Sequence, residues 1–423
     1  MRVITTYQHS VILDTSKCTG CTTCTKHCPT EAIRIKDGVA SINSDRCIDC
    51  GECIRHCPHH AKKANYSKFS TGDKGKWKIA LPAPTLYAQF DGLDDTNYVL
   101  SGLIDIGFDS VFEVAKAAEL VSAYTRNYLK FDWIKRPAIS SACPVIIRLI
   151  QFRFPSLTDN IVTLLPPVEI AAMMAREDAL SKHPELKAED IKVYFISPCP
   201  AKVSYVNNGF GKHKSYVDEV LSISDIYFQL LSVMKRKNEP RRLSESGRIG
   251  VSWAQSGGES SALFSEHYLA ADGIENVIRV LDQIENSSIP QLDFIELNAC
   301  PGGCVGGVMC VENPFIAKAR LLSLRKYLPV SQTFPQTEKG DNFIPRDFFF
   351  DEFPKYSPIS KLSDNIGESM RMMAAIQALK ESLPGIDCGA CGAPTCRAFA
   401  EDVVKGEARI KNCKIRTPED AEK

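Results

Sequence analysis

From residue 78 onward, short apolar runs alternate with longer stretches in which apolar residues recur at helical spacing. The short runs predict strands, and the longer stretches predict helices. The predicted strands are Lys78–Leu81, Val193–Ile196, Ile249–Trp253 and Asp293–Leu297, with a weaker one at Ala138–Ser140. The predicted helices are Ser110–Leu129, Val168–Leu180, Glu259–Ala271, Phe315–Leu328 and Ser363–Ser382. This alternation favours an α/β architecture with a largely parallel sheet.

Four of the predicted strands lead directly into loops that contain cysteine or glycine. The loops are Ser141–Pro144, Ser197–Lys202, Gln255–Gly258 and Asn298–Gly307. The carboxyl ends of parallel strands meet at the usual ligand crevice of an α/β sheet. We therefore expect cysteines that are far apart in the sequence to lie close together in the fold.

The N-terminal region contains an internal repeat of cysteines. Two runs share the spacing C-x2-C-x2-C-x3-C-P: the first is Cys18, Cys21, Cys24 and Cys28, and the second is Cys47, Cys50, Cys53 and Cys57. This spacing is typical of two-cluster bacterial ferredoxins, in which the fourth cysteine of each run binds the other cluster. It assigns one 4Fe–4S centre to Cys18, Cys21, Cys24 and Cys57, and the other to Cys47, Cys50, Cys53 and Cys28.

Composition narrows the class of protein. A chain of 423 residues is too long for one ordinary core, so two or three domains are expected. Lys plus Arg and Asp plus Glu are both 51, which gives no net charge to attract nucleic acid or an anionic membrane. The chain has no long apolar run to span a membrane and no signal peptide, so we expect a cytoplasmic protein. In a cytoplasmic protein, 17 cysteines indicate metal binding rather than disulfides.

A last group of cysteines lies near the C-terminus, with the spacing C-x2-C-x4-C-x16-C: Cys388, Cys391, Cys396 and Cys413. A helix that begins near Pro394 would carry Cys396 in its first turn, where the positive helix end favours a thiolate. The group resembles small 4Fe–4S domains of electron-transfer complexes. A zinc ion is the alternative to a cluster, because four thiolates also suit tetrahedral zinc.

Three further segments place a cysteine at the end of a predicted buried strand: 140–144, 197–202 and 296–304. Their four thiols are enough for one cubane, and they are Cys143, Cys199, Cys300 and Cys304. Glycines at 302, 303, 306 and 307 allow the backbone to approach a bulky inorganic group closely. Lys202 can place an ammonium group against an anionic ligand.

In order and spacing, these segments resemble the three signature motifs of the iron-only (FeFe) hydrogenases, and the resemblance extends from the N-terminal repeat to about Leu328. It implies an H-cluster: a cubane on the four central cysteines, joined through Cys304 to a two-iron subsite with CO, cyanide and an azadithiolate bridge. Pro198 and Lys202 match positions that meet a cyanide. Family members receive the subsite from dedicated maturases.

Three positions depart from the family pattern. Ala142 stands where a second cysteine normally passes protons to the subsite, and Ser197 and Asn298 each stand where methionine is usual. Serine and asparagine would put hydrogen-bonding groups near the subsite in place of thioethers, which should shift its redox states. Cys310 belongs to none of the sets, and we expect a buried structural thiol.

The sequence thus predicts an α+β two-cluster ferredoxin-like domain over 1–70, an α/β H-cluster domain with largely parallel sheets over 71–345, and a linker helix with a small cysteine-rich iron–sulfur domain over 346–423. The predicted function is reversible oxidation of H2 to protons, slowed by Ala142 and therefore sensory. The chain resembles the sensory group of this family that has no PAS domain. Electrons would pass through three further 4Fe–4S clusters to a ferredoxin or signalling protein. A non-catalytic electron-transfer protein and an iron–sulfur assembly protein are the alternatives.

Overall fold

The computed structural model describes residues 7–70, 75–209, 214–235, 239–335, 343–351 and 362–415. Contacts divide the chain into two units, Met1–Ala64 with Ser357–Lys423, and Asn65–Tyr356. The second unit therefore extends beyond 71–345 at both ends. At one end, Ser67 N donates a hydrogen bond to Val220 O at 2.9 Å, and at the other Phe350 N donates to Thr163 O at 3.0 Å.

The unit of residues 65–356 contains two parallel sheets. The first has the strand order β6-β5-β8-β9, with the bounds Ser110–Val111, Trp77–Pro82, Ile191–Ser197 and Glu219–Ser222. The second has the order β10-β11-β7, with the bounds Tyr268–Asp272, Phe294–Asn298 and Ala138–Ile139. Every neighbouring pair in both sheets is parallel. The predicted α/β class is confirmed.

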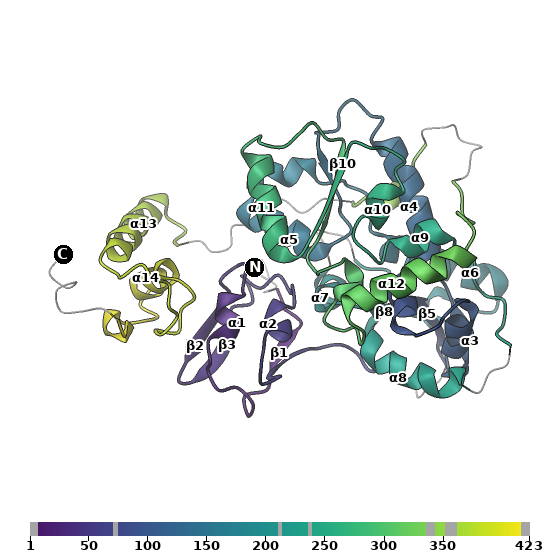
Figure 1. Ribbon diagram of the computed structural model, residues 1–423, viewed down its shortest axis with the longest axis horizontal. Coiled ribbons are helices and arrows are strands. Elements are labelled where there is room, and N and C mark those ends of the chain that lie inside the picture. The colour runs from purple at the N-terminus through teal and green to yellow at the C-terminus, as the bar shows by residue number, and fades with distance from the viewer. Residues whose placement is uncertain are drawn as a thin grey trace. The chain divides into compact units, whose positions relative to one another are not determined.

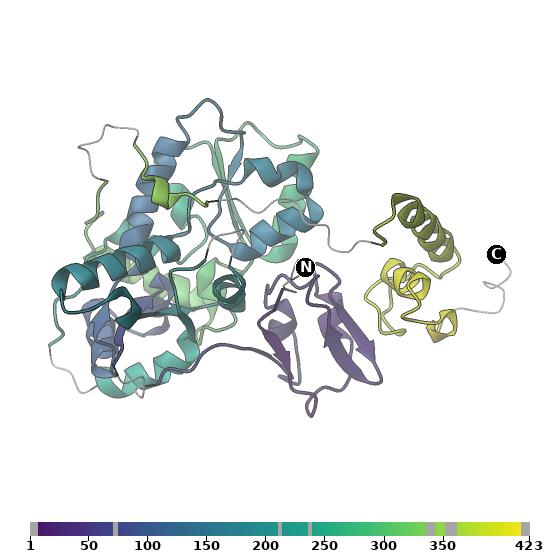
Figure 2. The same cartoon turned by 180° about the vertical axis from the view of Figure 1, so that it is seen from behind.

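Helices cover both sheets (Figures 1 and 2). Their bounds are α3 Asn97–Asp105, α4 Val114–Tyr128, α5 Pro144–Arg153, α6 Pro167–Lys182, α7 Pro200–Asn208, α8 Ile223–Met234, α9 Arg248–Ser252, α10 Gly258–Ser261, α11 Ile274–Glu285 and α12 Pro314–Leu324. One apolar cluster joins α3, α8 and α12 to β5 and β8. In α11 the buried residues recur at helical spacing, because only one face of the helix packs on the protein: Ile274, Val277, Leu281 and Ile284.

Two predicted elements are wrong. The predicted strand at 249–253 is instead helical, because residues 249–252 lie in α9 and Trp253 is its C-cap. A Cβ built on Gly250 would come within 2.0 Å of the Ala115 carbonyl oxygen, so glycine lets α9 pack directly on α4. The predicted helix at 259–271 is instead the short α10 followed by β10. Phe264 has φ +54°, which interrupts helical geometry, and residues 268–272 then pair with β11.

The other unit contains the ferredoxin-like domain and the C-terminal domain. The ferredoxin-like domain pairs β1 (Val11–Leu13) with β4 (Lys62–Ala64), and β2 (Ile33–Lys36) with β3 (Val39–Ile42), both antiparallel. Two one-turn helices, α1 (Thr23–Lys26) and α2 (Glu52–Arg55), occupy equivalent places in the repeat. The C-terminal domain consists mainly of α13 (Ile366–Glu381) and α14 (Cys396–Val404).

No helix in the described part of the chain is both long and apolar enough to cross a membrane.

Candidate active site and cluster-binding sites

The loops with the central cysteines leave the carboxyl ends of three parallel strands. Cys143 follows β7 and directly precedes α5, and Cys199 follows β8 and directly precedes α7. In both loops proline is the first helical residue. Proline fits there because an N–H at this position would have no partner within the helix. Cys300 and Cys304 follow β11. Three of the four predicted strand-to-loop junctions are therefore present, and the fourth loop, 255–258, follows a helix.

Close backbone contacts join these loops. The carbonyl oxygen of Pro198 accepts a hydrogen bond from Met309 N at 3.0 Å. A Cβ built on Gly307 would lie 2.3 Å from this oxygen, and one built on Gly303 would lie 2.4 Å from Ser256 N. Only glycine fits at the two positions without displacing backbone. The third signature segment is therefore held directly against the second segment and against the loop of Ser256.

The thiols of Cys143, Cys199 and Cys304 lie close enough to interact electrostatically. Burial and then the charge of Cys143 raise the pKa of Cys199 to about 11, and Lys202 acts in the opposite direction. Burial also raises the pKa of Cys304, and Cys199 and Cys143 add to this effect. Cys304 is nevertheless an exposed residue, so a ligand can reach it. Three thiols close enough to interact there suit a cluster, which binds the thiolate form.

Lys202 lies at the same site. Burial lowers the pKa of its ammonium group, while Cys199 and then Cys143 raise it. Its Nζ lies 5.0 Å from the centre of the Tyr205 ring. An ammonium group that is buried among thiols can hold an anionic ligand more firmly than an exposed one, because water does not compete for it.

Ser197 and Asn298, which replace the expected methionines, both form hydrogen bonds within the protein. The Ser197 hydroxyl accepts a bond from Cys199 N at 3.2 Å and donates to Cys199 O at 3.1 Å. Asn298 Nδ2 donates to Glu296 Oε1 at 2.9 Å. Each polar group therefore shapes the loop that carries a central cysteine.

Ala142 directly precedes Cys143, and its methyl group has no proton to give. Its N–H donates to Ser140 Oγ at 3.1 Å, and Ser140 Oγ donates to Glu259 Oε2 at 2.6 Å. The hydroxyl of Ser141 donates to Leu164 O at 2.7 Å. A buried hydrogen-bonded path thus leads from the backbone beside the cysteine to a carboxylate.

Glu259 and Glu296 form a buried pair of carboxylates, although the sequence pattern alone gives Glu296 no role. Burial and then the charge of Glu296 raise the pKa of Glu259 to about 8. Burial also raises the pKa of Glu296, whose oxygens accept bonds from Asn298 and from two backbone N–H groups of the 257–260 loop. A carboxylate inside an otherwise apolar predicted strand is the signal that could have identified Glu296.

Two hollows in the ferredoxin-like domain are each lined by cysteines from both halves of the repeat. One is lined by Cys18, Cys21, Cys24 and Cys57, and the other by Cys28, Cys47, Cys50 and Cys53. These are the two groups that the spacing predicts. Each offers the four thiols that a 4Fe–4S cluster needs. Within the described ranges, no three His, Cys, Asp or Glu side chains are gathered to hold a single metal ion.

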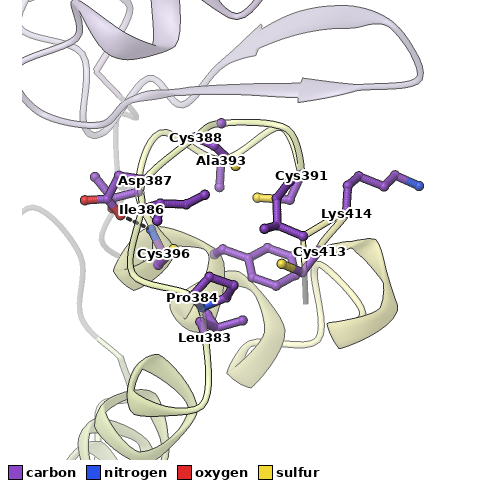
Figure 3. Close-up of a pocket in the computed structure, with 14 residues that line it drawn as sticks. Leu383, Pro384, Ile386, Asp387, Cys388, Cys391, Ala393, Cys396, Cys413 and Lys414 are labelled. Carbon is purple, nitrogen blue, oxygen red and sulfur yellow. Dashed lines mark hydrogen bonds between the residues drawn. The ribbon is translucent and has the colours of Figure 1, made fainter. Parts of the chain in front are cut away.

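The C-terminal cysteines line one hollow as well (Figure 3): Cys388, Cys391, Cys396 and Cys413. As expected, Cys396 lies in the first turn of α14, where Thr395 Oγ1 caps the helix by accepting a bond from Ala398 N at 3.0 Å. Asp387 Oδ1 accepts a further bond from Cys396 N at 2.6 Å. The donor set fits an iron–sulfur cluster.

Cys310, which was expected to be buried, is half-buried. Its Sγ lies 3.7 Å from the carbonyl oxygen of Cys304, to which it donates a weak hydrogen bond. Cys310 also packs against the main apolar cluster of the unit. These contacts fit a thiol that supports the third signature segment.

Comparison with known proteins gives the family. The model for the C-terminal domain of the iron-only hydrogenase large subunit matches residues 76–268 and 262–308, which together span more than half of the chain. A 4Fe–4S dicluster domain matches residues 10–58, and a putative Fe–S cluster domain matches residues 383–415. The chain therefore belongs to the iron-only (FeFe) hydrogenase family. It is a hydrogenase-like iron–sulfur protein with three recognisable parts.

A similar curated protein is the periplasmic [Fe] hydrogenase large subunit of Nitratidesulfovibrio vulgaris, 26% identical over 71% of this chain and 86% of that protein. Among solved structures, two variants of the [FeFe]-hydrogenase HydA1 from Chlamydomonas reinhardtii are similar. Both have a TM-score of 0.47 and cover 60% of this chain and 86% of theirs, at 17% and 16% identity.

Proposed function

We propose that this chain is an FeFe hydrogenase that reacts slowly and reversibly with H2 and serves as a sensor. The observation that carries the proposal is Ala142, which lies beside Cys143 with no ionisable proton. General acid–base help from a positioned side chain is commonly worth about 10²–10⁴-fold in rate. A site that keeps its cluster ligands but lacks the usual proton donor would therefore turn over slowly.

The residues that would hold the H-cluster are the four central cysteines, with Cys304 as the link to the two-iron subsite. When bound, the subsite supplies the splitting and formation of H2. Lys202 and the backbone around Pro198 would orient its anionic ligands from one side. The close fit of Gly303 and Gly307 fixes the Cys304 loop, so the subsite would meet a preformed wall.

Glu259 is a candidate proton carrier, although a carboxylate in the first turn of a helix is also an ordinary structural feature. Its hydrogen bond from Ser140 favours the first role, because that hydroxyl also meets the Ala142 N–H. A group with a pKa near 8 can both hold and release a proton near neutral pH. The chain of bonds from Glu259 nevertheless ends at the Ala142 amide, which does not pass protons on, so turnover stays slow.

The wider setting of the protein belongs to the same proposal. Three 4Fe–4S centres would carry electrons between the active site and a ferredoxin or signalling partner. Hydrogenase maturases would supply the two-iron subsite, and the expected location is the cytoplasm. Plain electron transfer is the competing function, because it needs every cluster except the subsite.

Infrared spectroscopy of protein matured with hydrogenase maturases tests the proposal. We expect bands from CO and cyanide, together with H2 turnover well below that of catalytic relatives. Missing bands after maturation would favour plain electron transfer, and fast turnover would end the sensory interpretation.

An Ala142→Cys variant sharpens this test. Turnover should rise toward that of catalytic relatives, and its pH dependence should change, because a thiol can then pass protons. Ala142→Ser is the matched control, since it adds a side chain of similar size that does not ionise near neutral pH. Equal behaviour of the two variants would mean that protons enter elsewhere.

A further inference from the structure

The strand β2 of the ferredoxin-like domain touches the cysteine loop of the C-terminal domain. Ile35 N donates a hydrogen bond to Gly392 O at 2.8 Å. A Cβ built on Gly392 would lie 2.1 Å from Ile35 O, and Gly392 has φ +89°. Glycine is therefore required for two reasons, the close contact and the backbone conformation. Because Gly392 is the neighbour of Cys391, the backbone contact is made beside a cluster ligand.

The same strand also borders a ferredoxin hollow. Ile35 and Gly20 line the hollow of Cys18 and its partners. Both residues also line a cleft together with Cys391. Ile35 and Gly20 therefore belong to the wall between this ferredoxin hollow and Cys391. In contrast, neither of them lines the hollow of Cys47 and its partners.

Two ion pairs that are largely shielded from water hold the domains together at this contact, beside a third pair that is exposed. Arg34 Nε donates to Asp402 Oδ2 at 2.6 Å, and Arg34 Nη2 donates to Asp402 Oδ1 at 3.1 Å. The two side chains are only 13% and 12% exposed. Arg46 forms a second pair with Glu401. A two-point pair that is largely shielded from water fixes orientation as well as distance.

We infer that the C-terminal centre exchanges electrons directly with the Cys18, Cys21, Cys24 and Cys57 centre. The inference rests on the proposed clusters and specifies the route between them. One electron leaves a reduced 4Fe–4S centre, which becomes oxidised by one unit, and the other centre is reduced by one unit. No bond or proton moves. Electron tunnelling weakens steeply with distance, so the thin wall selects this partner, and the C-terminal centre extends the ferredoxin relay.

Electron paramagnetic resonance of the full chain tests the route after reconstitution with iron and sulfide and without maturases. In the fully reduced protein, we expect spin–spin interaction between the C-terminal centre and the Cys18 centre. Arg34→Glu with Arg46→Glu should abolish it, because both ion pairs become repulsive. Lys17→Glu with Lys63→Glu is the matched control, since it makes the same total charge change at two exposed residues that face Asp14 within the ferredoxin-like domain.

Hydrogen exchange at the Ile35 amide provides an independent measure of docking. The amide is bonded to Gly392, so exchange should accelerate about tenfold or more in the double variant and stay unchanged in Lys17→Glu with Lys63→Glu. Exchanging the partners, Arg34→Asp with Asp402→Arg, should restore both protection and spin coupling toward the wild type. Gly392→Ala should lose both.

The outcomes separate this inference from the proposed function. Wild-type protein without coupling, or with zinc at the C-terminal site, would overturn the inference even if infrared bands prove the H-cluster. Coupling that survives the double variant would overturn it too. Coupled centres in a protein that never gains CO and cyanide bands would leave the inference standing and remove the hydrogenase function.

Discussion

The ferredoxin-like domain and the central site gather the same kind of ligand in different ways. Each ferredoxin hollow takes three of its cysteines from one short run and the fourth from the other run. The central cysteines come from three loops whose strands belong to two sheets. Local spacing therefore determines most of a ferredoxin site, whereas the central site exists only when the whole α/β unit has folded.

This difference makes the two regions sensitive to different changes. A ferredoxin hollow depends mainly on its own cysteines. The central site depends also on contacts between loops, such as that of Gly307 with the Pro198 carbonyl. Substitutions can therefore be chosen that damage one region and spare the other.

The largest effect is expected from Cys304→Ser. Because this thiol would link the two-iron subsite to the chain, H2 turnover by the matured protein should fall to background. Absorption of the ferredoxin clusters should persist, since their ligands come from other segments. Cys310→Ser is the matched control and should keep most of the activity. If Cys304→Ser also keeps it, the assignment of the bridging ligand is wrong.

A smaller effect is expected from Glu259→Gln. Folding raises the pKa of this carboxyl from 4.5 to about 8, so the folded state favours its protonated form. The contribution of Glu259 to the stability of the folded state is complete below pH 4.5 and disappears as the pH rises toward 8. The free energy of unfolding should therefore fall with pH in the wild type and fall less in Glu259→Gln.

Denaturant unfolding between pH 5 and 8, roughly the interval in which this group titrates, measures the effect. Glu266→Gln, at an exposed carboxylate, should retain the wild-type pH dependence. Parallel curves for all three proteins would show that Glu259 is ionised in the folded state and is no proton reservoir.

The smallest effect is expected from Thr395→Ala. Loss of the α14 cap should cost about 1 kcal/mol of stability, and loss of the hydrogen bond from Thr395 Oγ1 to Glu31 Oε1 adds to this cost. The C-terminal cluster should then be lost at a lower temperature. Its visible absorption, recorded during heating, measures this loss. Asn365→Ala removes the comparable cap of α13, away from the cysteines. Equal loss of the cluster in both variants would mean that the cap does not support the site.

Much of this arrangement could be predicted from the sequence. The spacing of the N-terminal cysteines anticipated how they group, and strands β5, β8 and β11 were recognised as apolar runs. The strand prediction for Ile249–Trp253 was wrong because a short buried run has no clear period. Gly250 lies at the contact between α9 and α4, which the sequence does not reveal. The segment 259–271 misled because one residue with positive φ, Phe264, divides it. The interaction of Glu259 with Glu296 could not be predicted, because the two residues are distant in the sequence and come together only in the folded structure.

The crossed cysteines of the repeat have a consequence for how the protein is assembled. Cys28 lies with the second run and Cys57 with the first. Neither half of the repeat alone has the four ligands of one cubane. Insertion of iron and sulfide into either hollow would bind the two halves to each other, so filling one hollow would help to form the other. Oxidative loss of one cluster would likewise expose its neighbour, and the two would be gained and lost as a pair.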